Sequence, residues 1–245
     1  MQKAKFYIPL VLLLTVIVVI FINRMPKQAE NIIKEKTSVC DGFLLPQGSI
    51  QKNIFLYNYN YMLSRPDLTL LLDKHNYLAA DYAPQDLITL RGRHKLREEA
   101  AEAFKAMQAA AKEDGIKIAP LSAYRDFEYQ KKIYERSKKY LGAQRTEKYV
   151  AAPGHSQHQL GTAVDITNTN INFESTPESL WLKRNAGDYG FSLSFPKGQE
   201  EKTGFAYEPW HYRYISPQGV LLQDMFFEGS QYDTLAFLSD CAAGT

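Results

Sequence analysis

The chain has few cysteines, few histidines and almost no net charge, and each shortage excludes a class of protein. Its 245 residues include only Cys40 and Cys241, too few for a disulfide-rich scaffold, and neither has the neighbouring Cys or His of a cysteine metal site. The 29 basic and 27 acidic residues give a net charge of +2, which lends no support to nucleic-acid binding. Hydrophobic residues form 45% of the chain, which excludes a disordered protein and is typical of a globular domain.

A long apolar run, residues 6–22, begins near the N-terminus behind Lys3 and Lys5. It is long enough for a membrane-spanning helix, and no small residues that suit signal-peptide cleavage follow it. We therefore expect residues 1–27 to be the retained signal anchor of a single-pass membrane protein, with a cleaved signal peptide as the alternative. The rest of the chain has 25 basic and 27 acidic residues and is expected on the extracytoplasmic side, periplasmic or cell-wall, of the cytoplasmic membrane.

Three further segments are expected after the anchor. Residues 28–67 form a polar stalk and a segment that wraps onto the main domain, residues 68–228 form the main domain, and residues 229–245 form a C-terminal tail. Cys40 and Cys241 lie near the two ends of the exported part, where an oxidising compartment permits a disulfide. The sequence leaves open whether the two sulfur atoms meet.

Helical and extended patterns mix along the main domain without a regular βαβ rhythm. The predicted helices, from apolar spacings of three and four and from capping residues, are 94–114, 126–142, 176–190 and one that begins at Pro217. The predicted strands are 116–122, 160–167 and 205–215. Prolines punctuate residues 42–91, which indicates short strands and loops there instead of long helices. The mixture predicts an α+β fold, with a small antiparallel sheet flanked by helices.

Three of the five histidines lie in two short motifs that suit a metal. These motifs are PGHSQHQLGTAVD at 153–165 and EPWHYR at 208–213. Together His158, Asp165 and His211 supply the three His or carboxylate ligands that a catalytic zinc takes. Asp165 lies in an apolar strand, where an unpaired carboxylate is costly to bury and a cation offsets the cost. Taken singly, each residue is better explained by a structural role: a strand-end backbone hydrogen bond for Asp165 and an aromatic cluster for His211.

Two charged residues near these motifs suit hydrolysis of an amide. Glu208 stands three residues before His211, and Pro209 indicates an interrupted strand that lets both side chains enter one cleft. A carboxylate there takes a proton from water and returns it to the leaving amine. Arg125, where a strand gives way to a helix, suits an oxyanion or a substrate carboxylate. The alternatives are a surface carboxylate for Glu208 and a surface salt bridge for Arg125.

The motifs SAYRDFEYQ (122–130), GHSQHQLGTAVDI (154–166) and EPWHYRY (208–214), in this order, resemble the signature of the VanY-like zinc D-alanyl-D-alanine carboxypeptidases and their LD-carboxypeptidase relatives. The resemblance covers residues 68–216 and implies an α+β domain of the Hedgehog/DD-peptidase type with Zn2+ on its sheet. It implies these site residues: zinc ligands His158, Asp165 and His211, catalytic base Glu208, carbonyl-polarising Arg125, and substrate contacts at Arg125, Gln130 and Ser156.

Two positions lie outside this pattern, because Gln157 stands where relatives usually have an acidic residue and His155 has no role in the family.

The resemblance implies a hydrolase, a zinc metallopeptidase that removes the C-terminal D-alanine from peptidoglycan stem peptides. The alternatives are an LD-carboxypeptidase of tetrapeptide stems, an endopeptidase, and a non-catalytic metal-bearing domain that binds wall peptides. We expect a membrane-attached monomer that binds no nucleic acid. DD or LD specificity, and a role in wall maturation or in antibiotic resistance, stay open.

Overall fold

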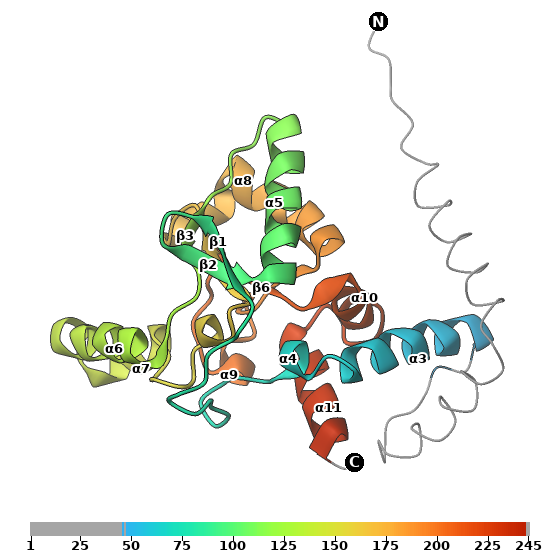
Figure 1. The fold of residues 1–245 in the computed structure, drawn as a ribbon, viewed down its shortest axis with the longest axis horizontal. Coiled ribbons are helices and arrows are strands. Elements are labelled where there is room, and N and C mark those ends of the chain that lie inside the picture. Colours follow the sequence, from blue (N-terminus) through green and yellow to red (C-terminus); the bar gives the residue numbers. More distant parts are fainter. Residues whose placement is uncertain (1–45, 47, 244–245) are drawn as a thin grey trace, which may run out of the picture.

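The computed structural model describes residue 46 and residues 48–243, in which helices surround two small antiparallel sheets (Figure 1). The α-helices are α3 (Ser49–Leu63), α4 (Pro66–Thr69), α5 (Glu98–Glu113), α6 (Phe127–Leu141), α7 (Ala143–Tyr149), α8 (Pro177–Asn185), α9 (Glu200–Thr203), α10 (Ser216–Phe226) and α11 (Gln231–Ala243). Short 3-10 helices are η1 (Gln157–Leu160), η2 (Ile171–Ser175) and η3 (Ala186–Tyr189). The strands are β1 (Leu87–Arg91), β2 (His94–Arg97), β3 (Pro120–Ser122), β4 (Ala163–Ile166), β5 (Phe191–Leu193) and β6 (His211–Tyr214). The predicted α+β fold with small antiparallel sheets is confirmed.

A four-stranded sheet of order β3-β4-β6-β5 lies at the centre, and each neighbouring pair of strands is antiparallel. Every residue of β4 and β6 is buried, so both faces of these strands are covered. In their register Asp165 lies opposite His211, and Ala163 lies opposite Arg213. Because side chains alternate along a strand, these two pairs share one face of the sheet. The fold therefore places a carboxylate beside an imidazole in the interior.

Helix α5 packs one apolar face into the core next to this sheet. Buried side chains recur every three or four residues along it, at Ala100, Phe104, Met107 and Ala111, and Ala101 is buried beside them. Phe104 meets Phe191 of β5 edge-on, with the ring centroids 5.9 Å apart. The predicted helical face is therefore present, but the helix begins at Glu98 instead of position 94. Residues His94–Arg97 form β2 instead, which pairs with β1.

The observed strands are shorter than their sequence patterns. The predicted strands 116–122, 160–167 and 205–215 reduce to Pro120–Ser122, Ala163–Ile166 and His211–Tyr214. The middle one is shortened because η1 occupies the start of its pattern and ends at Gly161, whose φ of 71° breaks the extended chain. A Cβ at Gly161 would lie 2.9 Å from a methyl carbon of Leu87, so this position requires glycine for space as well.

The segment at 42–91 differs from its prediction, because residues 49–63 form the long helix α3 instead of short strands and loops. Phe55, Tyr59 and Met62 are buried on one side of this helix. Phe55 meets Phe226 of α10 edge-on at 5.1 Å, and the hydroxyl of Ser216 donates to the Met62 sulfur at 3.4 Å. Contacts with a helix far along the chain therefore stabilise α3.

Two predicted helices have the expected ends. Helix α6 starts where the Asp126 carboxylate accepts a hydrogen bond from the Tyr129 amide at 2.7 Å, and it ends before Gly142. Helix α8 starts with the Thr176 hydroxyl as its cap and Pro177 as its first residue. It ends at Asn185, and η3 carries the chain on to Tyr189.

Several predictions fall on residues outside the described part of the chain. The anchor at 1–27 and Cys40 lie there, and so does most of the stalk. Cys241 takes part in a disulfide bond. Among the described residues, no helix has the length and hydropathy needed to span a bilayer.

Candidate metal centre

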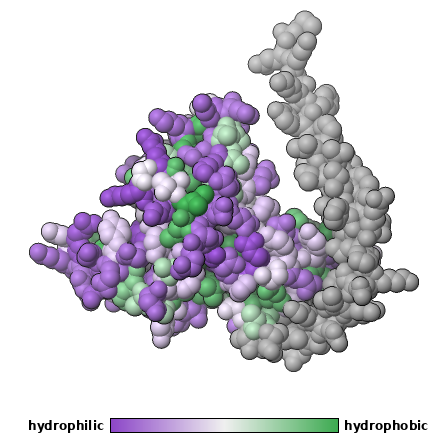
Figure 2. All heavy atoms as spheres, in the orientation of Figure 1, coloured by the Kyte–Doolittle hydropathy of each residue, from purple (hydrophilic) through white to green (hydrophobic). Residues whose placement is uncertain are grey.

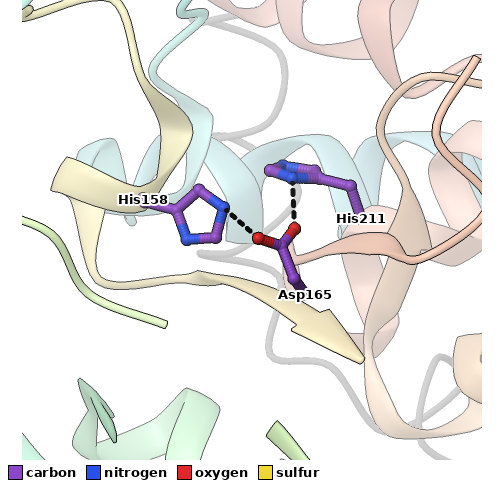
Figure 3. Close-up of side chains that lie close together, drawn as sticks. All are labelled: His158, Asp165 and His211. Carbon is purple, nitrogen blue, oxygen red and sulfur yellow. Dashed lines mark hydrogen bonds and ion pairs between the residues drawn. The ribbon is translucent and has the colours of Figure 1, made fainter. Parts of the chain in front are cut away.

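Three buried side chains, His158, Asp165 and His211, converge from η1, β4 and β6 (Figure 3). His158 Nε2 is 3.3 Å from Asp165 Oδ2, and His211 Nδ1 is 3.0 Å from Asp165 Oδ1. Ligand atoms bound to a tetrahedral zinc at 2.0–2.2 Å lie about 3.3–3.6 Å from one another. The three side chains therefore already stand near the spacing that zinc requires.

The His158 ring is orientated with its free nitrogen toward Asp165. Its Nδ1 donates to the carbonyl oxygen of Ala123 at 2.7 Å, so the lone pair of the neutral ring is on Nε2. Burial, with a contribution from the charge of Arg125, lowers the pKa of His158 to about 4, which keeps the ring neutral at pH 7. Nε2 is buried, has no hydrogen-bond partner and faces a carboxylate oxygen. A cation between these two acceptors satisfies both of them.

The His211 ring has the same arrangement with its nitrogens exchanged. Its Nε2 lies 3.1 Å from the amide oxygen of Gln157, and its Nδ1 lies 3.0 Å from Asp165 Oδ1. In the tautomer that donates from Nε2 to Gln157, the Nδ1 lone pair is available to a metal. Metal-binding histidines commonly donate their second N–H to a carbonyl or carboxylate, which fixes the ring. The sequence marked Gln157 only as a departure from the family pattern, and the structure gives it this orienting contact.

Asp165 is a carboxylate held in its ionised form. Burial by itself raises the pKa of this group, but a proton on the facing nitrogen of His158 or His211 holds the pKa well below its usual range, and a bound cation takes the place of that proton. Arg125 adds a positive charge, with Nη1 3.7 Å from Asp165 Oδ2. The group of two neutral imidazoles and one carboxylate fits a divalent cation such as zinc, and a backbone hydrogen bond is not needed to explain Asp165.

Glu208 approaches the metal ligands through a tight turn. Its carbonyl accepts from the His211 amide at 3.2 Å, which closes a four-residue turn with Pro209 at the second position. The interruption that Pro209 predicts is therefore present, and Glu208 Oε2 lies 3.7 Å from His211 Nδ1. Burial, together with the negative charge of Asp165, raises the pKa of Glu208 to about 8, while Arg125 opposes the rise. In the metal-free site Glu208 is consequently protonated at neutral pH, and a divalent cation held by the neighbouring ligands favours its ionised form, which can accept a proton.

Arg125 lies close to the Asp165 carboxylate. Its Nη1 donates to the Ser122 hydroxyl at 3.0 Å, and its Nε is buried without a partner. Burial lowers the pKa of Arg125, but an arginine keeps its charge at neutral pH. The surface salt bridge with Asp126 or Glu128 is absent, because within the described residues Arg125 pairs with Asp165 alone. Arg125 therefore offers a free donor beside the metal ligands.

The remaining predicted residues lie near the centre and have structural partners. Gln130 is buried on α6 and donates to the carbonyl of Ala151 at 2.7 Å, which leaves its own Oε1 without a partner. Ser156 caps η1 by accepting from the His158 amide at 3.3 Å. The substrate contacts of both residues remain predictions. His155 bonds to the carbonyl of Asp73 at 2.8 Å and lies outside the group of ligands.

Comparison with known proteins gives one family for the whole site. A family model described as VanY, D-alanyl-D-alanine carboxypeptidase, matches residues 93–217. A D-alanyl-D-alanine carboxypeptidase of Enterococcus faecium is 30% identical over 187 residues, which cover 74% of this chain and 57% of that protein. The chain spans about three fifths of the length of three curated relatives that it matches.

Solved structures share the fold as well. An LD-carboxypeptidase, LdcB, aligns with a TM-score of 0.62 and 32% identity, over 70% of this chain and 87% of that one. A vancomycin-resistance D,D-pentapeptidase, VanY, in complex with Zn(II), aligns with a TM-score of 0.59 and 30% identity, over 69% and 99%. The fold that brings His158, Asp165 and His211 together is therefore similar to the fold of a protein that binds zinc.

Proposed function

The chain belongs to the VanY D-alanyl-D-alanine carboxypeptidase family, and from this premise we propose that it releases the C-terminal D-alanine of peptidoglycan stem peptides. The observation that carries the proposal is that Arg125 lies beside Asp165 and Glu208 beside His211, two of the three residues that could hold the metal. A domain that only binds wall peptides has no need of a buried base at this position.

The residues divide the chemistry between them. His158, Asp165 and His211 would hold the zinc ion, which would supply Lewis acidity to polarise a carbonyl oxygen and to lower the pKa of a water. Glu208 accepts the proton that the water loses as its oxygen attacks the carbonyl carbon of the terminal amide. Arg125 donates to the carbonyl oxygen while negative charge develops there. When the C–N bond breaks, Glu208 returns the proton to the departing amine, and free D-alanine leaves.

The preferred substrate is a stem that ends in D-Ala-D-Ala. The curated relative from Enterococcus faecium and the Zn(II)-bound VanY are D,D-enzymes by name, which supports this choice. An LD-carboxypeptidase that acts on tetrapeptide stems is the second candidate, because the LdcB structure aligns at least as well.

Mass spectrometry of defined muropeptides tests the proposal. The full chain is incubated with pentapeptide and with tetrapeptide muropeptides, each with and without a metal chelator. The expected result is loss of one alanine from the pentapeptide, abolished by the chelator and restored by zinc. Shortening of the tetrapeptide alone supports the LD activity instead. A cut inside the stem indicates an endopeptidase, and binding without any change of mass overturns the enzymatic proposal.

We further propose that residues 1–27 attach the chain to the cytoplasmic membrane with residues 28–245 outside it. The apolar run at 6–22 and the lysines before it support this placement. Cell fractionation and protease treatment of intact protoplasts test it. The proposal expects the full chain in the membrane fraction, with residues 28–245 accessible to the protease, whereas protection of this part contradicts it.

A further inference from the structure

A helical hairpin, α6 and α7 (residues 127–149, here the arm), projects from the body at the opposite end of the molecule from the start of α3 (Figure 1). Only Gln130 in α6 and Thr146 in α7 are buried. The two helices are joined to each other by a hydrogen bond between the hydroxyls of Ser137 and Thr146 at 2.9 Å. The arm therefore contributes little to the core, and most of its surface is free to contact a partner.

The arm is strongly basic, whereas the rest of the described chain is acidic. The arm contains seven basic residues and three acidic ones. The other described residues contain 16 basic and 21 acidic residues, so the two parts have net charges of +4 and −5. In Figure 2 hydrophilic residues cover most of the visible face of the arm. A charge separation of this size creates a local positive potential although the whole chain is nearly neutral.

The positive charges of the arm are not neutralised by the protein. Within the described part of the chain, none of its seven basic residues forms an ion pair, whereas basic residues of the body do so at several places. Three arm lysines lie over tyrosine rings at 5.6–5.9 Å: Lys138 on Tyr134, Lys139 on Tyr140 and Lys148 on Tyr149. Such contacts hold the ammonium groups in place without removing their charge.

We propose that the arm binds a flexible linear polyanion whose repeating charge is a phosphodiester. Lysine is a compact point charge that suits phosphate, and five of the seven basic residues are lysines. The exposed rings of Tyr129 and Tyr140, 46% and 72% accessible, add flat apolar surface for the carbon backbone of such a polymer. Outside the cytoplasm a polyol phosphate has this chemistry.

An anionic membrane is a weaker candidate for the same charges. The chain enters the described domain at the start of α3, and the arm lies at the other end of the long axis (Figure 1). A domain attached to a bilayer through the residues before α3 would therefore hold the arm away from the lipid. The arm adjoins the metal centre instead, because Asp126 at its start follows Arg125 and the segment after Tyr149 leads to His158. A polymer on the arm would thus place the enzyme next to its substrate.

Binding of the full chain to fluorescein-labelled poly(glycerol phosphate) tests the proposal, with neutral dextran as a blank. The arm variant replaces Lys131, Lys132, Lys138 and Lys139 by Gln. The matched control replaces four exposed lysines of the body by Gln: Lys105, Lys112, Lys117 and Lys183. Circular dichroism and the thermal midpoint show whether each variant is folded.

The expected result is a dissociation constant at least tenfold higher for the arm variant and changed less than twofold for the control. If four phosphates are neutralised, binding of the unmodified chain weakens about 50-fold between 50 and 200 mM salt. Equal losses in the two variants, or no binding by the unmodified chain, overturn the proposal. So does an arm variant that keeps polymer binding but binds phosphatidylglycerol vesicles less tightly than the unmodified chain, because the partner is then a lipid surface.

Discussion

Replacement of Glu208 by Gln separates metal binding from catalysis. Gln has the same shape as Glu but cannot take a proton from water, and Glu208 is the carboxyl of the cleft that stands outside the metal ligands. General acid–base catalysis contributes about 10²- to 10⁴-fold to a rate. We therefore expect kcat for D-alanine release to fall by that factor, which corresponds to about 3–5 kcal/mol of activation free energy. The three ligand atoms are unchanged, so the variant keeps one zinc per chain at saturating zinc.

The assay measures D-alanine release and zinc content on the same sample. The matched control is Glu201→Gln, which changes an exposed carboxylate on α9 and is expected to leave both quantities unchanged. Asp165→Asn is the opposite comparison, because loss of a ligand lowers zinc content and activity together. A Glu208→Gln variant that retains activity within threefold of the unmodified enzyme refutes the assignment of the base. If the variant loses its zinc, Glu208 contributes to metal binding, and the loss of activity does not support its assignment as the base.

Three other predictions follow from the geometry. Removal of zinc should lower the temperature of half-unfolding, since a ligand present at 1,000 times its dissociation constant stabilises the folded state by about 4 kcal/mol. Calorimetry with and without a chelator measures this temperature, and an unchanged value contradicts the metal site. In the metal-free protein, the contribution of Glu208 to stability falls as pH rises from 4.5 to 8, because the unfolded state has lost the Glu208 proton there and the folded state, with a pKa of about 8, has not. His158, whose pKa falls to about 4 on folding, contributes in the opposite direction below pH 6.5, so the comparison of two chains that differ only at Glu208 isolates the effect. Urea titrations at pH 4 and pH 8 should show that Glu208→Gln is more stable than the unmodified chain only at pH 8. Gly190→Ala should destabilise the fold by about 2 kcal/mol or more, since φ is 75° and the new Cβ would lie 2.8 Å from the carbonyl carbon of Ser216. An unchanged urea midpoint for this variant contradicts the prediction.

The ligand residues could be predicted because they are concentrated in two short motifs. Their environment could not, because it depends on contacts between distant residues. Ala123 and Gln157, which select the tautomers of the two histidines, are separated from His158 and His211 by 35 and 54 residues along the chain. The motif therefore predicted which side chains bind a metal, and only the fold shows which ring nitrogen each one presents.

Helix α3 was predicted wrongly for a related reason. Its sequence has no clear amphipathic period: Tyr57 is 42% exposed, while the polar side chain of Asn58 is buried. No side chain caps its first turn, and no acidic residue lies there. The partners that stabilise it, Phe226 of α10 and Phe237 of α11, come more than 160 residues later. Tertiary packing overrides a weak local preference here, and a local pattern contains no information about such partners.

Burial at the metal centre connects the stability of the fold to its chemistry. The low dielectric around β4 and β6 raises the proton affinity of Glu208 and lowers that of His158. The same burial leaves the Nε2 lone pair of His158 facing Asp165 without a hydrogen-bond partner, an arrangement that is unfavourable unless a cation lies between them. The interior that holds Glu208 next to the ligands is thus also the interior that needs the metal, so loss of the cation should weaken folding and catalysis together.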